Sequence, residues 1–320
     1  MPVIKVDNLH VAVRATPILR GVSFEVEAGK TLGVVGESGC GKSMTGKAIM
    51  GMLPNGGTVT EGSILLNDRE LTTLSKKEWL SIRGQEIALV MQDPFTSLNP
   101  LMRVGDQIAE VLTLHKGMSK FDAQVQAVEL LEKVGVPSPV DSSRKYPHQM
   151  SGGQRQRVVI AIAFAARPKL LIADEPTTAL DVTLQAQILR LLKQMQEEEN
   201  TAVILISHDI GVIASVSDQM AVYYAGRVVE MGDTEEVLRT PQHPYTQALL
   251  EAMPTVGMDR LRVISGQPPL LADLPEGCSF APRCPFAFDK CNAEPPLFPA
   301  EGTEAACWRL ESGSVATPKG

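Results

Sequence analysis

Residues 31–52 hold the feature that most constrains the fold, because an apolar run, a glycine-rich loop and a helix-forming stretch follow one another directly. The loop reads GESGCGKS from Gly36 to Ser43 and fits the pattern G-x-x-x-x-G-K-[ST] at each fixed position. Its glycines let backbone N–H groups turn inward around an anion, and the following helix points its positive dipole end at the same place. This order indicates an α/β fold that binds phosphate. The flanking segments disfavour the alternative, a glycine-rich turn without a ligand.

Short apolar segments alternate with helical stretches up to about residue 232, which predicts a mainly parallel sheet with helices on both faces. The expected strands are residues 22–26, 31–35, 64–66, 87–91, 170–173, 202–206, 221–224 and 227–230. The expected helices are residues 41–52, 104–116, 123–134, 153–166 and 184–199. The interval from about 105 to 167 lacks a good strand, so we expect a helical insertion there.

Two further segments carry groups that suit nucleotide chemistry. The apolar run 170–173 ends in Asp174 and Glu175, where one carboxylate would hold Mg²⁺ and the other would activate a water. Ser151 precedes two glycines and is expected to cap a helix whose first N–H groups stay open to an anion. Taken singly, these segments can also be a solvated strand end and a simple helix cap. Two anion cradles far apart in one sequence suggest a nucleotide held between two molecules.

Taken together, these segments resemble the ATP-binding subunit of an ABC transporter. SGGQ at 151–154 is the signature element of that family, and Gln92 matches its glutamine loop. Residues 179–181 match its D-loop, and His208 matches its switch histidine. The resemblance implies a P-loop NTPase (RecA-like) core with a helical subdomain at about 105–167.

The resemblance implies roles for individual residues. Glu175 would be the catalytic base, with Gln92 and His208 as further catalytic groups, and Mg²⁺ would be held by Ser43, Gln92 and Asp174. ATP would lie between the phosphate loop of one subunit and the signature segment of another. These ATP-binding residues are Gly36, Glu37, Ser38, Gly39, Cys40, Gly41, Lys42 and Ser43, together with Ser151, Gly152, Gly153 and Gln154.

Longer stretches are similar to the dipeptide and oligopeptide importers within this family, namely 90–100, 146–158, 173–188 and 243–250. This resemblance covers nearly the whole chain and implies an ATPase domain at 1–240 and a C-terminal extension at 241–320. One position departs from the family pattern, because Val13 stands where an aromatic ring usually stacks on adenine and His10 is the nearest substitute. Since such stacking contributes roughly 1–3 kcal/mol, weak nucleotide binding or loose base selectivity is expected.

The implied function is to hydrolyse ATP and thereby power import of peptides, with nickel, opines or another small solute as the alternative cargo. The implied partners are a paralogous ATPase subunit forming a heterodimer, two membrane permease subunits and, through the complex, an extracytoplasmic solute-binding protein. The chain would sit peripherally on the cytoplasmic face of the cell (inner) membrane, since its longest apolar run, 158–166, is well short of the about 20 residues that a span needs. A net charge of −7 and single copies of each motif disfavour the rival class, an ABC ATPase that acts on DNA or ribosomes.

Four of the five cysteines lie in a proline-rich stretch near the C-terminus, at Cys278, Cys284, Cys291 and Cys307. Because disulfides are unusual in a reducing cytosol, a local group of four suggests a metal. The group contains no C-x2-C pair, so the usual zinc spacing does not apply. The family resemblance supports a [4Fe–4S] cluster, with zinc and buried free thiols as alternatives. A redox-sensing role beside transport also stays open.

Overall fold

The computed structural model describes residues 1–178, 180–253 and 264–311. The chain forms two compact units, each assembled from segments that are far apart in the sequence. The first unit comprises Met1–Ile4, Val26–Lys30 and Leu66–Leu205. The second unit comprises Lys5–Glu25, Thr31–Leu65 and Ile206–Gly320. The phosphate loop therefore belongs to the second unit, whereas the acidic strand end and the SGGQ segment belong to the first.

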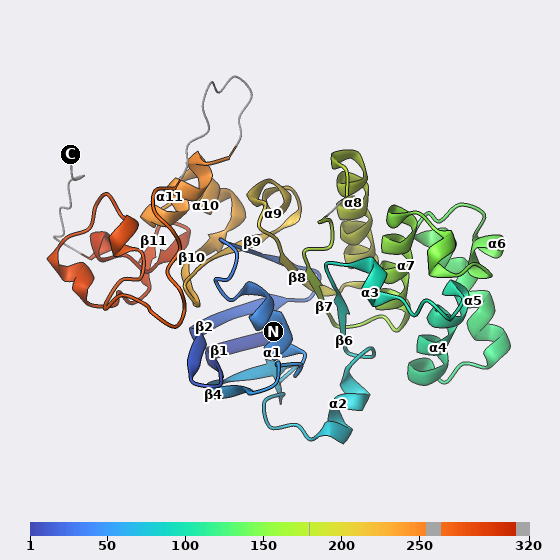
Figure 1. Ribbon diagram of the computed structural model, residues 1–320. Coiled ribbons are helices and arrows are strands. Elements are labelled where there is room, and N and C mark those ends of the chain that lie inside the picture. The colour runs from blue at the N-terminus through green and yellow to red at the C-terminus, as the bar shows by residue number, and fades with distance from the viewer. Residues whose placement is uncertain (179, 254–263, 312–320) are drawn as a thin grey trace. The chain divides into compact units, whose positions relative to one another are not determined.

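A β-sheet with both parallel and antiparallel pairs runs through the second unit (Figure 1). β3 (Thr31–Val35) pairs in parallel with β9 (Gln219–Tyr224), and β9 pairs antiparallel with β10 (Arg227–Asp233). β3 is buried along its whole length, as expected for an uninterrupted apolar run. The helix α9 (Ile210–Val216) packs on β3, while α1 (Lys42–Ile49) begins directly after the phosphate loop.

A separate N-terminal sheet has the strand order β2-β1-β4, formed by β2 (Thr16–Glu27), β1 (Pro2–Val13) and β4 (Gly57–Leu66). The sequence predicts only short pieces of β2 and β4 and does not predict β1. The reason lies in β1 itself, where Asp7 and Asn8 are exposed in succession and interrupt the alternation of buried and exposed residues. Asn8 also has a φ of 44°, so the strand is irregular at this point.

The first unit contains parallel strands and most of the helices. β6 (Ile87–Val90) and β7 (Leu170–Asp174) pair in parallel, with Ile87 opposite Leu170, and β8 (Ala202–Ile206) lies beside β7. These strands match the expected ranges to within one residue at either end. The short elements of this unit are β5 (Arg69–Glu70), α2 (Lys76–Ile82) and α3 (Pro94–Ser97).

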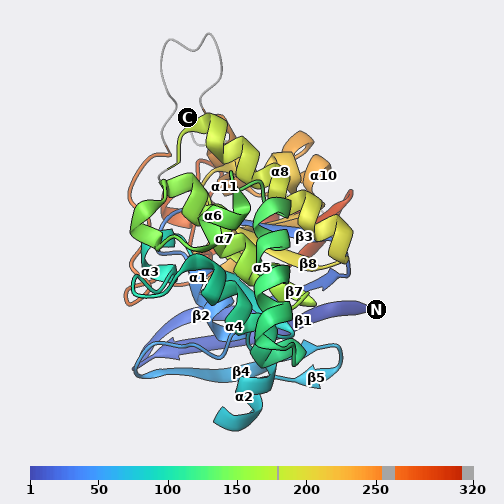
Figure 2. The same ribbon diagram turned by 90° about the vertical axis from the view of Figure 1, so that its right-hand side faces the viewer.

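The predicted helical insertion is confirmed. Between β6 and β7 the described chain forms helices, and α4, α5 and α7 pack against one another (Figure 2). The helices of this insertion, and the one that follows β7, are α4 (Val104–Lys116), α5 (Lys120–Lys133), α6 (Pro139–Ser143), η1 (Pro147–Gln149), α7 (Gly152–Ala165) and α8 (Val182–Glu199). α7 buries Val158, Ile160 and Phe164, which belong to the apolar run that begins at Val158.

The described part of the C-terminal extension has more regular structure than its proline content suggests. β12 (Thr303–Ala305) pairs antiparallel with β10, with Ala305 opposite Glu230, and β11 (Phe298–Ala300) pairs with β12. The expectation of a mainly parallel sheet is therefore incomplete, because β10, β12 and β11 add antiparallel pairs. α10 (Thr234–Arg239) comes just before the extension, whose remaining elements are α11 (Pro244–Glu251), η2 (Ala281–Arg283), η3 (Asp289–Asn292) and η4 (Trp308–Leu310). Within the described residues, no helix is both long and apolar enough to cross a membrane.

Candidate functional site

The phosphate loop depends on glycine where the backbone is left-handed and tightly packed. Gly36 has a φ of 153°, and a Cβ placed on it would lie 2.2 Å from the carbonyl oxygen of Tyr223. Gly39 has a φ of 81° with open space around it, so there the backbone conformation alone requires glycine. Lys42 curls into the loop, where its Nζ donates to the carbonyl oxygens of Gly36 (2.7 Å) and Glu37 (3.0 Å). The loop thus surrounds a buried ammonium group, as expected of an anion cradle.

Two features adjoin the loop in the second unit. Cys40 is buried within it, and burial raises the pKa of its thiol, while the nearby Lys42 opposes that rise. A neutral, buried thiol acts as a small apolar filler here. Beside the loop lies a cavity of about 360 Å³, lined by Glu37–Cys40, by Tyr224 and Ala225, and by the prolines and leucines of 268–271. The C-terminal extension therefore forms one wall next to the phosphate loop.

The acidic strand end in the first unit brings two predicted catalytic residues together. Gln92 Nε2 donates to Glu175 Oε2 at 3.0 Å, and Thr178 Oγ1 donates to the same oxygen at 2.9 Å. Glu175 follows the last residue of β7 and has a φ of 50°, an uncommon backbone conformation for a residue with a side chain. Such strain is typical of functional positions, and the two donors fix the direction of the carboxylate. Sequence reasoning did not single out Thr178.

The signature segment forms the start of α7. Ser151 Oγ accepts from the backbone N–H of Gln154 (3.3 Å), and Gln154 Oε1 accepts from the backbone N–H of Ser151 (3.0 Å), a reciprocal capping box. Gly152 has open space where a Cβ would stand, whereas a Cβ on Gly153 would lie 2.6 Å from Leu184 Cδ2. The cap is the one expected from the sequence. Gly152 is the glycine that leaves the helix start uncovered, while Gly153 lets α7 approach Leu184.

The remaining motif residues sit at element ends. His208 lies in the exposed turn between β8 and α9, and Asp209 caps α9 by accepting from the backbone N–H of Gly211 at 2.8 Å. In the D-loop, Asp181 caps α8 and accepts from the backbone N–H of Leu184 at 2.9 Å, while Ala179 lies outside the described residues. Val13, which stands where the family usually has an aromatic ring, is the last residue of β1. His10 is engaged elsewhere on the N-terminal sheet, with its Nε2 3.2 Å from Asn8 Oδ1 and 4.0 Å from a Glu61 oxygen.

The four C-terminal cysteines are neighbours in the fold. The backbone N–H of Cys278 donates to the carbonyl oxygen of Cys291 at 2.9 Å. Burial is the main cause that raises the pKa of the Cys278 thiol to about 11, and the nearby Cys291, Cys307 and Cys284 contribute to this rise. Within the described residues, no group of three or more His, Cys, Asp or Glu side chains is arranged to hold a metal ion. The cysteines are therefore near one another, but the described residues do not form a metal site.

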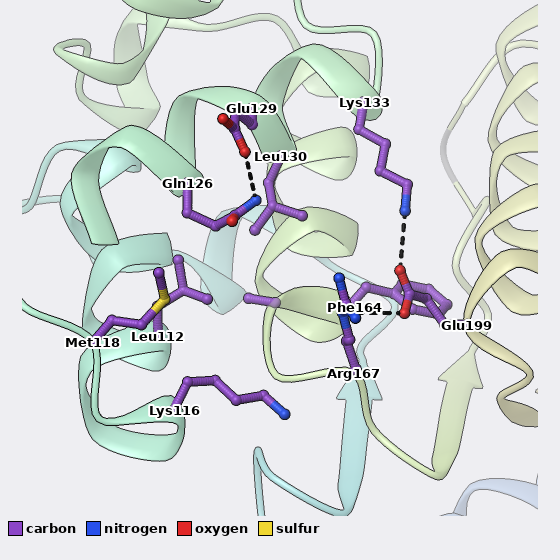
Figure 3. Close-up of a pocket in the computed structure, with 11 residues that line it drawn as sticks. Leu112, Lys116, Met118, Gln126, Glu129, Leu130, Lys133, Phe164, Arg167 and Glu199 are labelled. Carbon is purple, nitrogen blue, oxygen red and sulfur yellow. Dashed lines mark hydrogen bonds and ion pairs between the residues drawn. The ribbon is translucent and has the colours of Figure 1, made fainter. Parts of the chain in front are cut away.

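A further cavity of about 450 Å³ lies among the helices of the first unit (Figure 3). Leu112, Leu130 and Phe164 line its apolar side. Glu199 also lines the cavity and accepts from Lys133 Nζ (3.0 Å), while Arg167 Nε lies 3.3 Å from the other oxygen of Glu199. The described residues that line this cavity include no motif residue, so the nucleotide chemistry belongs elsewhere in the chain.

Comparisons with known proteins agree with these motifs. Residues 19–178 match the family described as "ABC transporter", and residues 229–291 match "Oligopeptide/dipeptide transporter, C-terminal region". The chain is 49% identical over 318 residues to the dipeptide transport ATP-binding protein DppD of Lactococcus lactis, covering 97% of this chain and 91% of that protein. It is 49% identical over 301 residues to the oligopeptide transport ATP-binding protein OppD of Salmonella typhimurium, covering 92% and 89%.

Solved structures agree at the level of the ABC transporter ATPase. The ATP-binding cassette MJ0796, in a dimeric post-hydrolysis state bound to ADP and Pi, matches with a TM-score of 0.64 and 28% identity over 72% of this chain and 98% of that chain. CbiO1 of Clostridium perfringens, part of the ABC transporter complex CbiONQ, matches with a TM-score of 0.66 and 27% identity over 75% and 91%. The phosphate loop, the acidic strand end, the capped signature helix and these relatives lead to one conclusion: the chain belongs to the dipeptide/oligopeptide family of ABC transporter ATP-binding proteins, the ATP-hydrolysing subunits of these importers.

Proposed function

We propose that this chain powers peptide import as one of two ATPase subunits of a transporter complex. ATP would be bound by the phosphate loop of this chain and by the Ser151–Gln154 segment of a partner ATPase. The observation that carries the proposal is the Glu175 carboxylate, which Gln92 and Thr178 hold by hydrogen bonds at the end of a buried parallel strand. The capped but uncovered start of α7 supports the shared arrangement, because its open N–H groups suit the phosphate of another molecule.

The roles of the site residues follow from their chemistry. Lys42 would contact the β- and γ-phosphates, and Glu175 would accept a proton from the attacking water. Ser43, Gln92 and Asp174 would hold Mg²⁺, since hydroxyl, amide and carboxylate oxygens are the ligands that Mg²⁺ prefers. When bound, the ion supplies charge neutralisation at the phosphates. His208 would donate a hydrogen bond to the γ-phosphate. The hydrogen bonds from Gln92 and Thr178 would aim the Glu175 carboxylate, because together they restrict rotation of its side chain. The strained backbone of Glu175 would help to set the direction in which that side chain leaves β7.

Replacing Glu175 by Gln tests the catalytic part of this proposal. The amide keeps the size of the side chain but cannot take a proton, so ATP binding should remain while turnover falls by at least about tenfold. The measurement is steady-state ATPase activity of the assembled complex, with nucleotide binding to the isolated chain as the control. Turnover within a few-fold of the unmodified complex would show that Glu175 is not the base.

The proposed partners are a paralogous ATPase subunit, two permease subunits and an extracytoplasmic solute-binding protein, with this chain peripheral to the cytoplasmic face of the cell membrane. The segment after Gln92 offers a surface for the permeases, because Leu101 is 86% exposed although it is apolar. Replacing Leu101 by Asp should lower transport and leave ATP binding to the isolated chain unchanged. Replacing Leu80, which is also apolar and largely exposed (73%), by Asp serves as the control. Equal transport losses for both variants would contradict a special role of this segment.

The cargo is tested directly by uptake. We propose peptides, because the relatives that match along nearly the whole chain are named for dipeptide and oligopeptide transport. Cells that lack the native subunit and carry this chain with its permeases should accumulate a labelled dipeptide but not nickel or an opine. Uptake of nickel without uptake of peptide would replace the peptide assignment by the alternative cargo.

We also propose that residues 1–240 are the ATPase domain and residues 241–320 its peptide-importer-type extension.

We further propose a [4Fe–4S] cluster on the four C-terminal cysteines, with zinc as the alternative. The donor set fits in kind, because thiolates bind both, and the fold brings the four residues near one another. Within the described residues these side chains are not arranged to hold a metal ion, so the support comes from the kind of donor and from the family resemblance. Anaerobically purified protein should be brown and carry about four irons per chain, and Cys291→Ser should bleach it. Zinc without iron would support the alternative, and neither metal would leave four free thiols.

A further inference from the structure

Glu37, the second residue of the phosphate loop, forms an ion pair with the C-terminal extension. Arg283 Nη1 lies 2.7 Å from Glu37 Oε2, and Arg283 Nη2 lies 3.0 Å from Glu37 Oε1, so the pair is bidentate. The two residues are 246 positions apart in the sequence. The side chain of Arg283 is only 5% exposed, and that of Glu37 is 22% exposed. This geometry is the strongest form of an arginine–carboxylate contact, and little water screens it.

The surroundings hold Arg283 in place for this contact. Its Nε donates to the carbonyl oxygen of Ser265 at 2.9 Å, and Nη1 also donates to the Tyr224 hydroxyl at 3.2 Å. The guanidinium lies 5.8 Å from the centre of the Tyr224 ring and 5.9 Å from that of Phe280. Since a guanidinium stays charged throughout the physiological pH range, these contacts present a fixed positive charge to the loop.

The backbone of Glu37 is also held, on one side by the extension and on the other by the loop lysine. Its N–H donates to the Tyr245 hydroxyl at 2.9 Å, and its carbonyl oxygen accepts from Lys42 Nζ at 3.0 Å. Tyr245 is fully buried against Tyr224 and Phe280. Side-chain and backbone contacts from the extension therefore determine where Glu37 points, and Glu37 in turn contacts the residue that would bind phosphate.

A carboxylate in a polyphosphate-binding loop is electrostatically unfavourable unless it is neutralised, because like charges repel. We infer that Arg283 is a positioning residue for ATP, which neutralises Glu37 and fixes the phosphate loop, so that the C-terminal extension sets the nucleotide affinity of this subunit. The family comparisons assign no such role to either residue. The inference deepens the ATP-binding function without depending on the cargo or on a metal at the cysteines.

The test is ATP binding to the purified full chain, measured by calorimetry for a set of matched variants. Arg283→Gln should weaken ATP binding by at least about tenfold, because it leaves the Glu37 charge unpaired beside the phosphates. The loss should shrink at high ionic strength and should be smaller for ADP, which carries less charge. Adding Glu37→Gln should restore most of the affinity, since the double variant has no unpaired charge. Arg283→Lys should bind ATP more tightly than Arg283→Gln, because it keeps the positive charge.

Glu294 provides the control for a purely structural role of Arg283. Its carboxylate ties the extension to Arg20 (2.6 Å) and Arg227 (2.8 Å), and both of these ion pairs lie outside the phosphate loop. Glu294→Gln should therefore leave ATP affinity unchanged, with folding of all variants checked by thermal unfolding. The inference fails if Arg283→Gln binds ATP normally. It also fails if the double variant is as weak as Arg283→Gln, since Arg283 would then be only a structural tie. If Arg283→Gln does not fold, Arg283→Lys replaces it: this variant should bind ATP more weakly than the unmodified chain, because an ammonium group cannot make the bidentate contact, and adding Glu37→Gln should restore the affinity.

Discussion

At the scale of single residues, the fold places titratable groups where their charge states differ from those in water. His243 is buried at the start of α11, where its Nδ1 accepts from the backbone N–H of Tyr245 at 3.0 Å and its ring packs near Phe280. Burial lowers the pKa of His243 to about 3. Glu230 on β10 is also buried, and its carboxylate accepts from the backbone N–H groups of Gln242 (2.7 Å) and His243 (2.9 Å).

Acid should therefore destabilise the fold through His243. Between about pH 6.5 and pH 3 the unfolded chain binds a proton at this position and the folded chain does not, so the free energy of unfolding falls as the pH falls. The slope is at most about 1.4 kcal/mol per pH unit. Glu230 acts in the opposite sense, because burial raises its pKa. His243→Asn keeps an acceptor near Nδ1 and should flatten the pH dependence of urea unfolding between pH 4 and 6.5. An unchanged slope would contradict this account.

At the scale of elements, helix starts follow local rules and could be located from the sequence. α7 begins where Ser151 and the glycines predict, and α8 begins after Asp181 with the same kind of side-chain cap. Helix α4 has the predicted bounds, because its apolar residues recur with helical spacing and a glycine ends it. The role of each glycine was not predictable, because only the packed structure shows that Gly153 faces Leu184 while Gly152 faces open space.

Gly152 is accordingly the position at which to test whether the start of α7 acts on a partner's nucleotide. An aspartate fits there without a clash, and its charge suits the positive end of the helix, so Gly152→Asp should fold normally. The isolated chain should still bind ATP, while ATPase activity of the assembled complex should fall by about tenfold or more because a carboxylate faces phosphate. Gly152→Ala is the matched control without charge. Loss of ATP binding by the isolated Asp variant would contradict the shared arrangement.

At the scale of the whole molecule, the described residues of the C-terminal extension, 241–253 and 264–311, pack as part of the second unit. Tyr224 of β9, Tyr245 of α11 and Phe280 near the cysteines form one aromatic cluster, with ring centres 4.6 to 5.4 Å apart. Each of the three is nearly or completely buried. β12 adds a further tie by pairing with β10. The extension thus contributes core residues as well as the Arg283 contact with the phosphate loop.

Removing the ring at the centre of this cluster should loosen the extension. Phe280→Ala should lower the free energy of unfolding of the second unit by about 3–5 kcal/mol, the usual result of deleting a buried aromatic side chain. Hydrogen exchange should then speed up in residues 264–311 and around β9, while α4 and α5 of the first unit keep their protection. Phe121→Ala is a suitable control, because that ring is 78% exposed. Unchanged exchange in 264–311 would show that the cluster does not hold the extension.

The sequence by itself determined the features that depend on local spacing. The phosphate loop, the buried strands β3, β7 and β8, and the cap of α7 each follow from residues within a few positions of one another. Only the tertiary structure decided which distant residues meet. The Arg283–Glu37 pair spans 246 positions, and the pairing of β12 with β10 joins segments that share no periodic pattern. Such contacts leave no local signal, because they arise from the packing of whole elements and not from the preferences of the residues that make them.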